Sequence, residues 1–218
     1  MNPAAALTTT LGFRPDSKIR EALPTSFPTL DALIEGFPRG AISEILGPES
    51  SGRTTLVHSL LAASTAKLEV CAYIDTDDSF DPVSAAAAGV ALSQLVWIRC
   101  GHNAGHALKA ADYLLHAGGF GVIVLDLCQV TPRVSNRIPI SYWYRFRLAI
   151  ENTPTILALV EKHPQAKSCA ALMLELERKK TVFTGAPGFA LLRELEFEAT
   201  PRKPIRPHKA HFKARAIG

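Results

Sequence analysis

Apolar residues recur along this chain in two alternating patterns from residue 41 onwards. Short continuous apolar runs are typical of buried strands, and apolar residues three and four positions apart are typical of amphipathic helices. Glycines such as Gly118-Gly119 mark where a helical pattern stops. The predicted strands are residues 41–46, 70–75, 95–99, 121–126 and 155–160, and the predicted helices are residues 54–66, 82–90, 103–117 and 138–151.

Two longer alternating segments follow, at residues 169–177 and 189–197. The sequence GAPG at Gly185–Gly188 lies between them and predicts a turn that joins an antiparallel pair. Strands that alternate with helices predict a parallel sheet covered by helices. The expected fold is therefore α/β, with a mostly parallel central sheet flanked by helices and an antiparallel strand extension.

The composition fits a globular chain. Of 218 residues, 47% are hydrophobic and 20% are charged, which argues against wholesale disorder. The four cysteines are far apart and form no CxxC pair, which indicates reduced thiols and not a zinc site or a disulfide framework. The chain shows no signal peptide and no apolar run near the roughly 20 residues of a membrane helix. These features predict a cytoplasmic protein without a membrane partner.

Charge is distributed unevenly along the chain. Residues 201–218 carry six Lys or Arg and no acid, and removing them from the net charge of +4 leaves −2 for the rest. The predicted division is an N-terminal extension (1–24), a core (25–200) and a basic flexible tail (201–218). This tail is either a solubilising terminus or a docking arm for an acidic partner or DNA. Its nucleic-acid candidates are Arg202, Lys203 and Arg206.

Residues 47–55 read GPESSGRTT and lie between a predicted strand and a predicted helix. A phosphate-binding loop needs glycines, here Gly47 and Gly52, so that backbone N–H groups can turn toward the oxygens at a helix N-terminus. Thr54 has the position at which a hydroxyl ligates Mg²⁺. The pattern predicts a site for ATP and Mg²⁺, and the alternative is a glycine turn that binds nothing. The candidate cofactor-binding residues are Gly47, Glu49, Ser50, Ser51, Gly52, Arg53, Thr54 and Thr55.

Carboxylates close two of the predicted strands. Asp126 ends the apolar run 121–126 and can hold Mg²⁺ through water, although a strand-end carboxylate can also cap the next turn. Asp75, Asp77 and Asp78 close the strand 70–75 at the same edge of the sheet. Asp77 is the candidate catalytic residue that would orient an attacking water, and the alternative is a solvated strand end.

Three segments resemble the RecA family. GPESSGRTTL at 47–56 resembles its phosphate loop, and YIDTDDSFDP at 73–82 is similar to the segment that carries its catalytic glutamate, whose position Asp77 takes. VIVLD at 122–126 resembles its magnesium-linked strand, with Asp126 matching. The resemblance covers roughly residues 25–178 and implies a RecA-like P-loop core that uses ATP and Mg²⁺.

The chain departs from the family pattern at functional positions. Arg53 replaces the phosphate-loop lysine and keeps its charge but not its geometry. Asp77 replaces the glutamate and is one methylene shorter. Val83-Ser84 stands where the family has a tyrosine that stacks on adenine, and Lys162 lies near a glutamine that senses the γ-phosphate. Only residues 163–167 replace the long DNA-gripping loop. We therefore expect a weak ATPase at most.

The reduced size, altered loop and basic tail resemble ImuA-type RecA paralogues. These accompany an inactive Y-family polymerase homologue and an error-prone polymerase in damage-induced mutagenesis, as part of the SOS response. The resemblance implies a DNA repair and translesion accessory protein, with polymerases, DNA or a RecA-type filament as partners. The alternatives are a DNA-dependent ATPase and a cell-division inhibitor of the SulA type, and the retained GPESSG at 47–52 disfavours the second.

Arginines and aromatic residues crowd residues 133–147, a mixture that can stack on bases and neutralise phosphates. Arg133 and Arg137 are DNA candidates and fall near the first DNA-binding loop of RecA. Tyr142 and Phe146 are expected to pack on the sheet, because the helical stripe already explains them. His102 and His106 lie four apart without a third ligand, so no metal is expected there.

Overall fold

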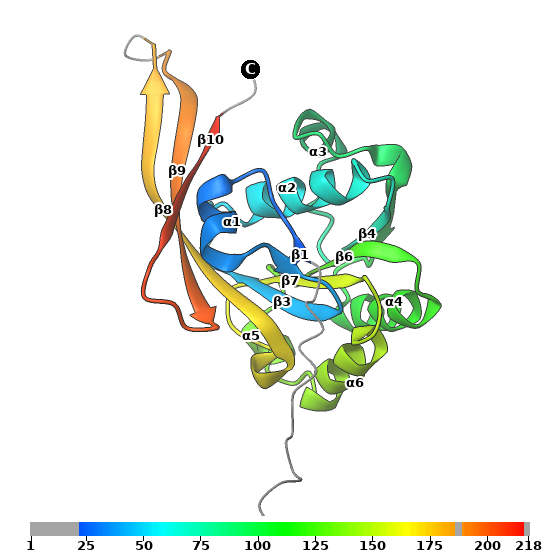
Figure 1. Cartoon of the computed structure of the whole chain (residues 1–218). Coiled ribbons are helices and arrows are strands. Elements are labelled where there is room, and N and C mark those ends of the chain that lie inside the picture. The colour runs from blue at the N-terminus through cyan, green and yellow to red at the C-terminus, as the bar shows by residue number, and fades with distance from the viewer. Residues whose placement is uncertain (1–21, 186–188, 216–218) are drawn as a thin grey trace, which may run out of the picture.

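The computed structural model describes residues 22–185 and 189–215, which fold around one eight-stranded sheet (Figure 1). The strand order is β10-β9-β8-β3-β7-β6-β4-β5. The strands are β3 (Ala41–Leu46), β4 (Val70–Asp75), β5 (Leu95–Arg99), β6 (Phe120–Asp126), β7 (Ile156–Glu161), β8 (Ala170–Thr184), β9 (Leu191–Lys203) and β10 (Ala210–Arg215). A separate two-stranded sheet pairs β1 (Ala22–Leu23) with β2 (Phe37–Pro38).

The six strands from β8 to β5 run parallel, and β9 and β10 continue the sheet in antiparallel pairing. This arrangement confirms the predicted mostly parallel sheet with an antiparallel extension. β8 and β9 are longer than predicted and stand out from the body as a hairpin (Figure 1). The turn residues 186–188 between them lie outside the described residues.

Helices cover both faces of the parallel strands, which makes three layers (Figure 1). On one face, Leu56, Leu60 and Leu61 pack against the sheet as their helical spacing predicted, and on the other face Ala107 and Phe146 do so. Over the described residues, no helix is long and apolar enough to span a membrane. The helices are α1 (Pro28–Ile34), α2 (Arg53–Thr65), α3 (Pro82–Ala87), α4 (Ala104–Ala117), α5 (Pro132–Ser135) and α6 (Ile140–Ile150), with short 3₁₀ turns at Leu92–Gln94 and Lys167–Cys169.

The prediction of a flexible tail at 201–218 is wrong for the part that the structure describes. Residues up to Lys203 end β9, and β10 pairs with β9 along its whole length. Phe212 is buried, with its ring centroid 4.6 Å from that of Phe27 and 5.3 Å from that of Phe197. The prolines of this segment lie outside β10, so they do not interrupt its hydrogen bonds.

The predicted N-terminal extension, 1–24, falls almost entirely on residues 1–21, which lie outside the described residues. Its last residues, Ala22 and Leu23, belong to β1, and the Leu23 side chain is buried in the core.

Candidate nucleotide site

The phosphate loop lies between the end of β3 and the start of α2, as predicted. Gly47 and Gly52 have positive φ angles of 152° and 94°, a conformation that disfavours side chains. A Cβ atom at Gly47 would lie 2.5 Å from the carbonyl oxygen of Leu176 and from Ser51 Oγ. At Gly52, a Cβ would lie 2.8 Å from the ring of Phe197. Only glycine therefore fits at either position.

The loop also presents unused polar groups. α2 begins without a side-chain cap, so its first N–H groups are free to face an anion. Ser51 Oγ is buried and has no hydrogen-bond partner in the described chain. Thr54, in the first turn of α2, is exposed. A glycine cradle, an uncapped helix end and a partnerless hydroxyl fit a bound phosphate group, with the Thr54 hydroxyl available for Mg²⁺.

Arg53 does not extend freely over this loop. Its side chain is buried, and Nη1 donates to the backbone carbonyl of Glu161, at 3.0 Å, where β7 ends. The planar guanidinium therefore ties the start of α2 to the neighbouring strand. The positive charge of Arg53 is present at the loop, as the sequence predicted. Its guanidinium, however, is hydrogen-bonded to the Glu161 carbonyl within the protein.

A second cation lies across the loop. Lys162 Nζ donates to Glu49 Oε1 at 3.1 Å, which links the phosphate loop to the residue that follows β7. The hydrogen bond from Lys162, and then its charge, lower the pKa of the Glu49 carboxyl. Both side chains are solvent-accessible, so a stronger anion can displace Glu49 from Lys162.

Asp126 ends β6, as predicted, and its side chain is buried. Its Oδ2 accepts a hydrogen bond from the Tyr73 hydroxyl at 2.7 Å, and its Oδ1 accepts one from the backbone N–H of Cys128 at 2.9 Å. Burial and the Asp126 carboxylate raise the pKa of Tyr73, so the phenol stays a donor. Each carboxylate oxygen keeps a lone pair, so Asp126 can still hold a magnesium-bound water.

The turn after β4 uses its carboxylates differently. Buried Asp75 accepts hydrogen bonds from the backbone N–H groups of Ser79 and Phe80, at 3.0 Å each, and from the Trp97 indole at 3.1 Å. Asp75 therefore shapes the turn.

The other acids of this turn are also engaged. Asp78 makes a bidentate pair with Arg99, with both contacts at 2.9 Å, and the hydrogen bond from Arg99 lowers the pKa of Asp78. Asp77, the candidate catalytic residue, is partly buried with its Oδ1 3.2 Å from His102 Nδ1. His102 is therefore part of this contact.

The nucleic-acid candidates separate into two groups. Arg133 on α5 and Arg137 just after it are exposed. The tail candidates are engaged with the body: Arg202 pairs with Glu175, Lys203 Nζ donates to the carbonyl of Ser168 at 2.9 Å, and Arg206 Nη2 lies 3.1 Å from Glu35 Oε1. The unlike charges of tail and body thus neutralise each other at Arg202 and Arg206.

The aromatic residues of α6 mostly serve the core. Phe146 is buried and Tyr142 is half-buried, which confirms that they pack on the sheet. Trp143, which the predicted stripe missed, is buried as well. Arg145 lies over the Tyr142 ring, with its guanidinium carbon 4.8 Å from the ring centroid.

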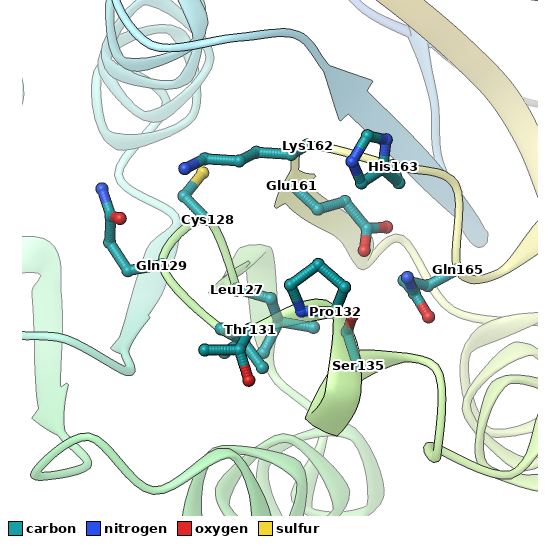
Figure 2. Close-up of a pocket in the computed structure, with 11 residues that line it drawn as sticks. Leu127, Cys128, Gln129, Thr131, Pro132, Ser135, Glu161, Lys162, His163 and Gln165 are labelled. Atoms are coloured by element: carbon teal, nitrogen blue, oxygen red, sulfur yellow. The ribbon is translucent and has the colours of Figure 1, made fainter.

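A pocket of about 190 Å³ opens beside the phosphate loop, between residues 127–135 and residues 161–165 (Figure 2). Sequence reasoning missed the most unusual feature here: Glu161 on β7, which lines the pocket, and Glu44 on the adjacent strand β3 are both buried acids. The available signal was a single charged residue inside each of two otherwise apolar strands, AISEIL at 41–46 and ILALVE at 156–161.

Comparison with known proteins agrees with this architecture. The family model of the RecA N-terminal domain matches residues 8–136, more than half of the chain. RecA of Bifidobacterium longum is 32% identical over 200 residues, which are 90% of this chain and 50% of that protein. RecA of Rickettsia prowazekii is 42% identical over 118 residues, or 53% of this chain and 34% of that protein.

The sheet, its flanking helices and the phosphate loop define a RecA-like P-loop α/β protein. The chain belongs to the RecA family, and it spans about half or less of the length of the relatives it matches.

Proposed function

We propose that this chain is a RecA-like accessory protein of DNA repair that binds ATP and Mg²⁺ in the loop 47–55 and hydrolyses ATP slowly at most. The observation that carries the binding half is the loop itself, with its glycine cradle, uncapped helix end and partnerless Ser51 hydroxyl. Thr54 and Asp126 are the residues that would hold the magnesium, and the ion would supply charge neutralisation at the phosphates.

Slow turnover follows from how the remaining charges are engaged. Arg53 donates to the carbonyl of Glu161, and Asp77 contacts His102 instead of standing free. Well-placed charge at a transferring phosphoryl group is worth on the order of 100-fold or more in rate. A protein with both positions altered is better suited to holding a nucleotide than to cycling through it.

The proposed role in DNA repair rests on membership of the RecA family and on the short connection between β7 and β8. The connection between β7 and β8 is only residues 162–169, so the chain has little loop here with which to grip DNA. Arg133 and Arg137 remain exposed for a DNA or filament contact. We further propose an ImuA-type role beside translesion polymerases, which the small size and altered phosphate loop support.

Calorimetric titration with ATP and Mg²⁺ tests the binding half. Thr54→Ala should weaken binding by roughly 10-fold or more, because it removes an oxygen ligand of the metal. Thr184→Ala, an exposed threonine far along the β8–β9 hairpin, is the matched control and should bind like the parent chain. Absence of binding in the parent would contradict the proposal and would favour a SulA-type protein.

Co-purification tests the polymerase role. The chain should retain a Y-family polymerase homologue encoded near it, at both low and high salt. Brisk ATP hydrolysis with single-stranded DNA, and no polymerase retained, would instead identify a DNA-dependent ATPase.

A further inference from the structure

Two carboxyl groups lie next to each other at the pocket of Figure 2, and one of them, Glu161, is among the residues that line it. Glu44 on β3 is fully buried and Glu161 on β7 is 3% exposed. β3 and β7 are adjacent and parallel, with Glu44 opposite Leu159 and Leu46 opposite Glu161. The two acids are therefore two positions apart on the same face of neighbouring strands, within reach of each other.

The protein satisfies only part of this pair. Glu44 Oε1 accepts the backbone N–H groups of Gln165, at 2.7 Å, and Ala166, at 2.6 Å. Glu44 Oε2 and both carboxylate oxygens of Glu161 make no hydrogen bond to the described residues. A proton shared between the two carboxyls satisfies one oxygen of each. One Glu161 oxygen remains without a partner, and the Glu161 side chain lines the pocket between Pro132 and Gln165 (Figure 2).

The pair also lacks a counter-ion. One shared proton leaves one negative charge in a buried site, which is costly unless a cation compensates it. Neither acid forms an ion pair within the part of the chain that the structure describes. Arg53 reaches only the backbone carbonyl of Glu161, and Lys162 points away from the Glu161 carboxyl toward Glu49 (Figure 2).

We propose that this pocket is a binding site for a guanidinium group, carried by an arginine of a partner protein. A guanidinium is planar, holds five N–H donors and is weakly hydrated, so it can meet Glu161 with two parallel hydrogen bonds. The shared proton stays between the two carboxyls when the guanidinium binds, so the positive charge offsets the one negative charge of the pair and the site becomes neutral. No residue of the phosphate loop lines this pocket, so its test uses no nucleotide.

The walls of the pocket suit the rest of an arginine side chain. Leu127, Val130 and Pro132 provide apolar surface for the methylene stem. Thr131 and Ser135 offer hydroxyl oxygens to the outer N–H groups. The cavity volume of about 190 Å³ exceeds many times the roughly 10–15 Å³ that one water needs. No three His, Cys, Asp or Glu side chains of the described chain are grouped to hold a metal ion, so an organic cation fits better.

The test is titration of the purified chain with N-acetylarginine methylamide, followed by amide NMR shifts of residues 161–166. Binding on the order of 1 mM is expected for this single side chain. The citrulline analogue has the same shape without the charge and should bind at least 10-fold more weakly. Equal shifts with both compounds, or none with arginine, would overturn the proposal.

Variants locate the site. Glu161→Gln is nearly isosteric and keeps a donor for Glu44, so it should fold and should weaken arginine binding at least 10-fold. Glu151→Gln removes an exposed acid elsewhere and should leave binding unchanged. Equal affinity of the parent and Glu161→Gln would contradict the assignment, and the citrulline comparison decides it if Glu161→Gln does not fold.

A last comparison identifies the source of the guanidinium. A pentapeptide with arginine at its centre should bind more tightly than the free derivative if a partner protein supplies the group. Equal affinities would contradict a protein source and would point to a free small cation.

Discussion

The turns that follow β3 and β4 lie at the same edge of the sheet, but they use their polar groups in opposite ways. In the phosphate loop, Ser51 Oγ is buried without a partner and α2 begins without a side-chain cap. In the turn after β4, Asp75 accepts four hydrogen bonds and Asp78 pairs with Arg99. The first turn has unpaired polar groups that can bind a ligand. In the second turn, the polar groups form hydrogen bonds that stabilise the turn itself.

This difference separates binding from turnover. Burying a polar group without a hydrogen-bond partner costs free energy. A loop that contains such groups is therefore suited to bind a ligand that supplies the partner. A turn whose carboxylates are already satisfied has little left with which to orient a water molecule. Within one sheet edge, the proposed nucleotide-binding loop thus keeps unpaired polar groups, whereas the carboxylates proposed for hydrolysis are engaged within the protein.

The largest effect is expected from Asp75→Ala. It removes the acceptor of four donors, and hydrogen bonds to a charged group contribute roughly 1.5–3 kcal/mol each, so the free energy of unfolding should fall by about 3 kcal/mol or more. Urea unfolding measures it. Asp78→Ala, which breaks an exposed pair, is the control and should cost under about 1 kcal/mol. An equal fall in the free energy of unfolding for both variants would contradict the structural role of Asp75.

Gly52→Ala should act on the other turn and on binding. The new Cβ meets the Phe197 ring at 2.8 Å and the φ of 94° is unfavourable, so the loop must move. We expect ATP affinity to fall about 30-fold, equivalent to roughly 2 kcal/mol.

Gly101→Ala is the matched control for this change. Gly101 also has a positive φ, 58°, but a Cβ there meets nothing within 4 Å. Gly101→Ala should lose some stability from backbone strain alone and keep its nucleotide affinity. If both variants bind ATP like the parent, the loop is not the nucleotide site.

Arg53→Lys should raise ATP turnover about 10-fold. A lysine is a compact charge without the fork that reaches the Glu161 carbonyl, so it is free to contact the phosphates. Steady-state ATPase with single-stranded DNA measures the change. Arg53→Ala is the control and should not activate. If both variants raise ATP turnover, the cause would be loss of the hydrogen bond to the Glu161 carbonyl and not the presence of a lysine.

The smallest effect is expected from Asp77→Ala. Its partner His102 is 71% exposed, so the contact should add less than about 0.5 kcal/mol to stability. The residual ATP turnover should change less than threefold, compared with the roughly 100-fold or greater loss that removal of a working general base causes. A 100-fold loss would show that Asp77 acts as the catalytic carboxylate after all.

The sequence predicted the parallel part of the sheet. The strands at 41–46, 70–75 and 95–99 have the predicted bounds, because each is a short apolar run between turn signals. The sequence did not predict the strand Ala210–Arg215 in the tail. This strand is stabilised by contacts of Phe212 with Phe27 and Phe197, which are distant in sequence. Local composition pointed to disorder, and tertiary packing overrode it.

The candidate site divides in the same way. The glycine spacing predicted the position of the loop between β3 and α2, since strand, loop and helix are contiguous in sequence. Where Arg53 points, and that Lys162 meets Glu49, depends on how β7 lies beside β3, which spacing does not encode. The pairing of Glu44 with Glu161 depends on the same strand register.

One single-turnover experiment tests the separation of binding from hydrolysis most directly. The chain is mixed in excess with labelled ATP, Mg²⁺ and single-stranded DNA, and the bound nucleotide is recovered at intervals beside a full-length RecA. The account predicts that the bound label stays ATP, with hydrolysis at least about 100-fold slower than in the full-length protein. Bound ADP appearing as fast as in the full-length RecA would contradict it.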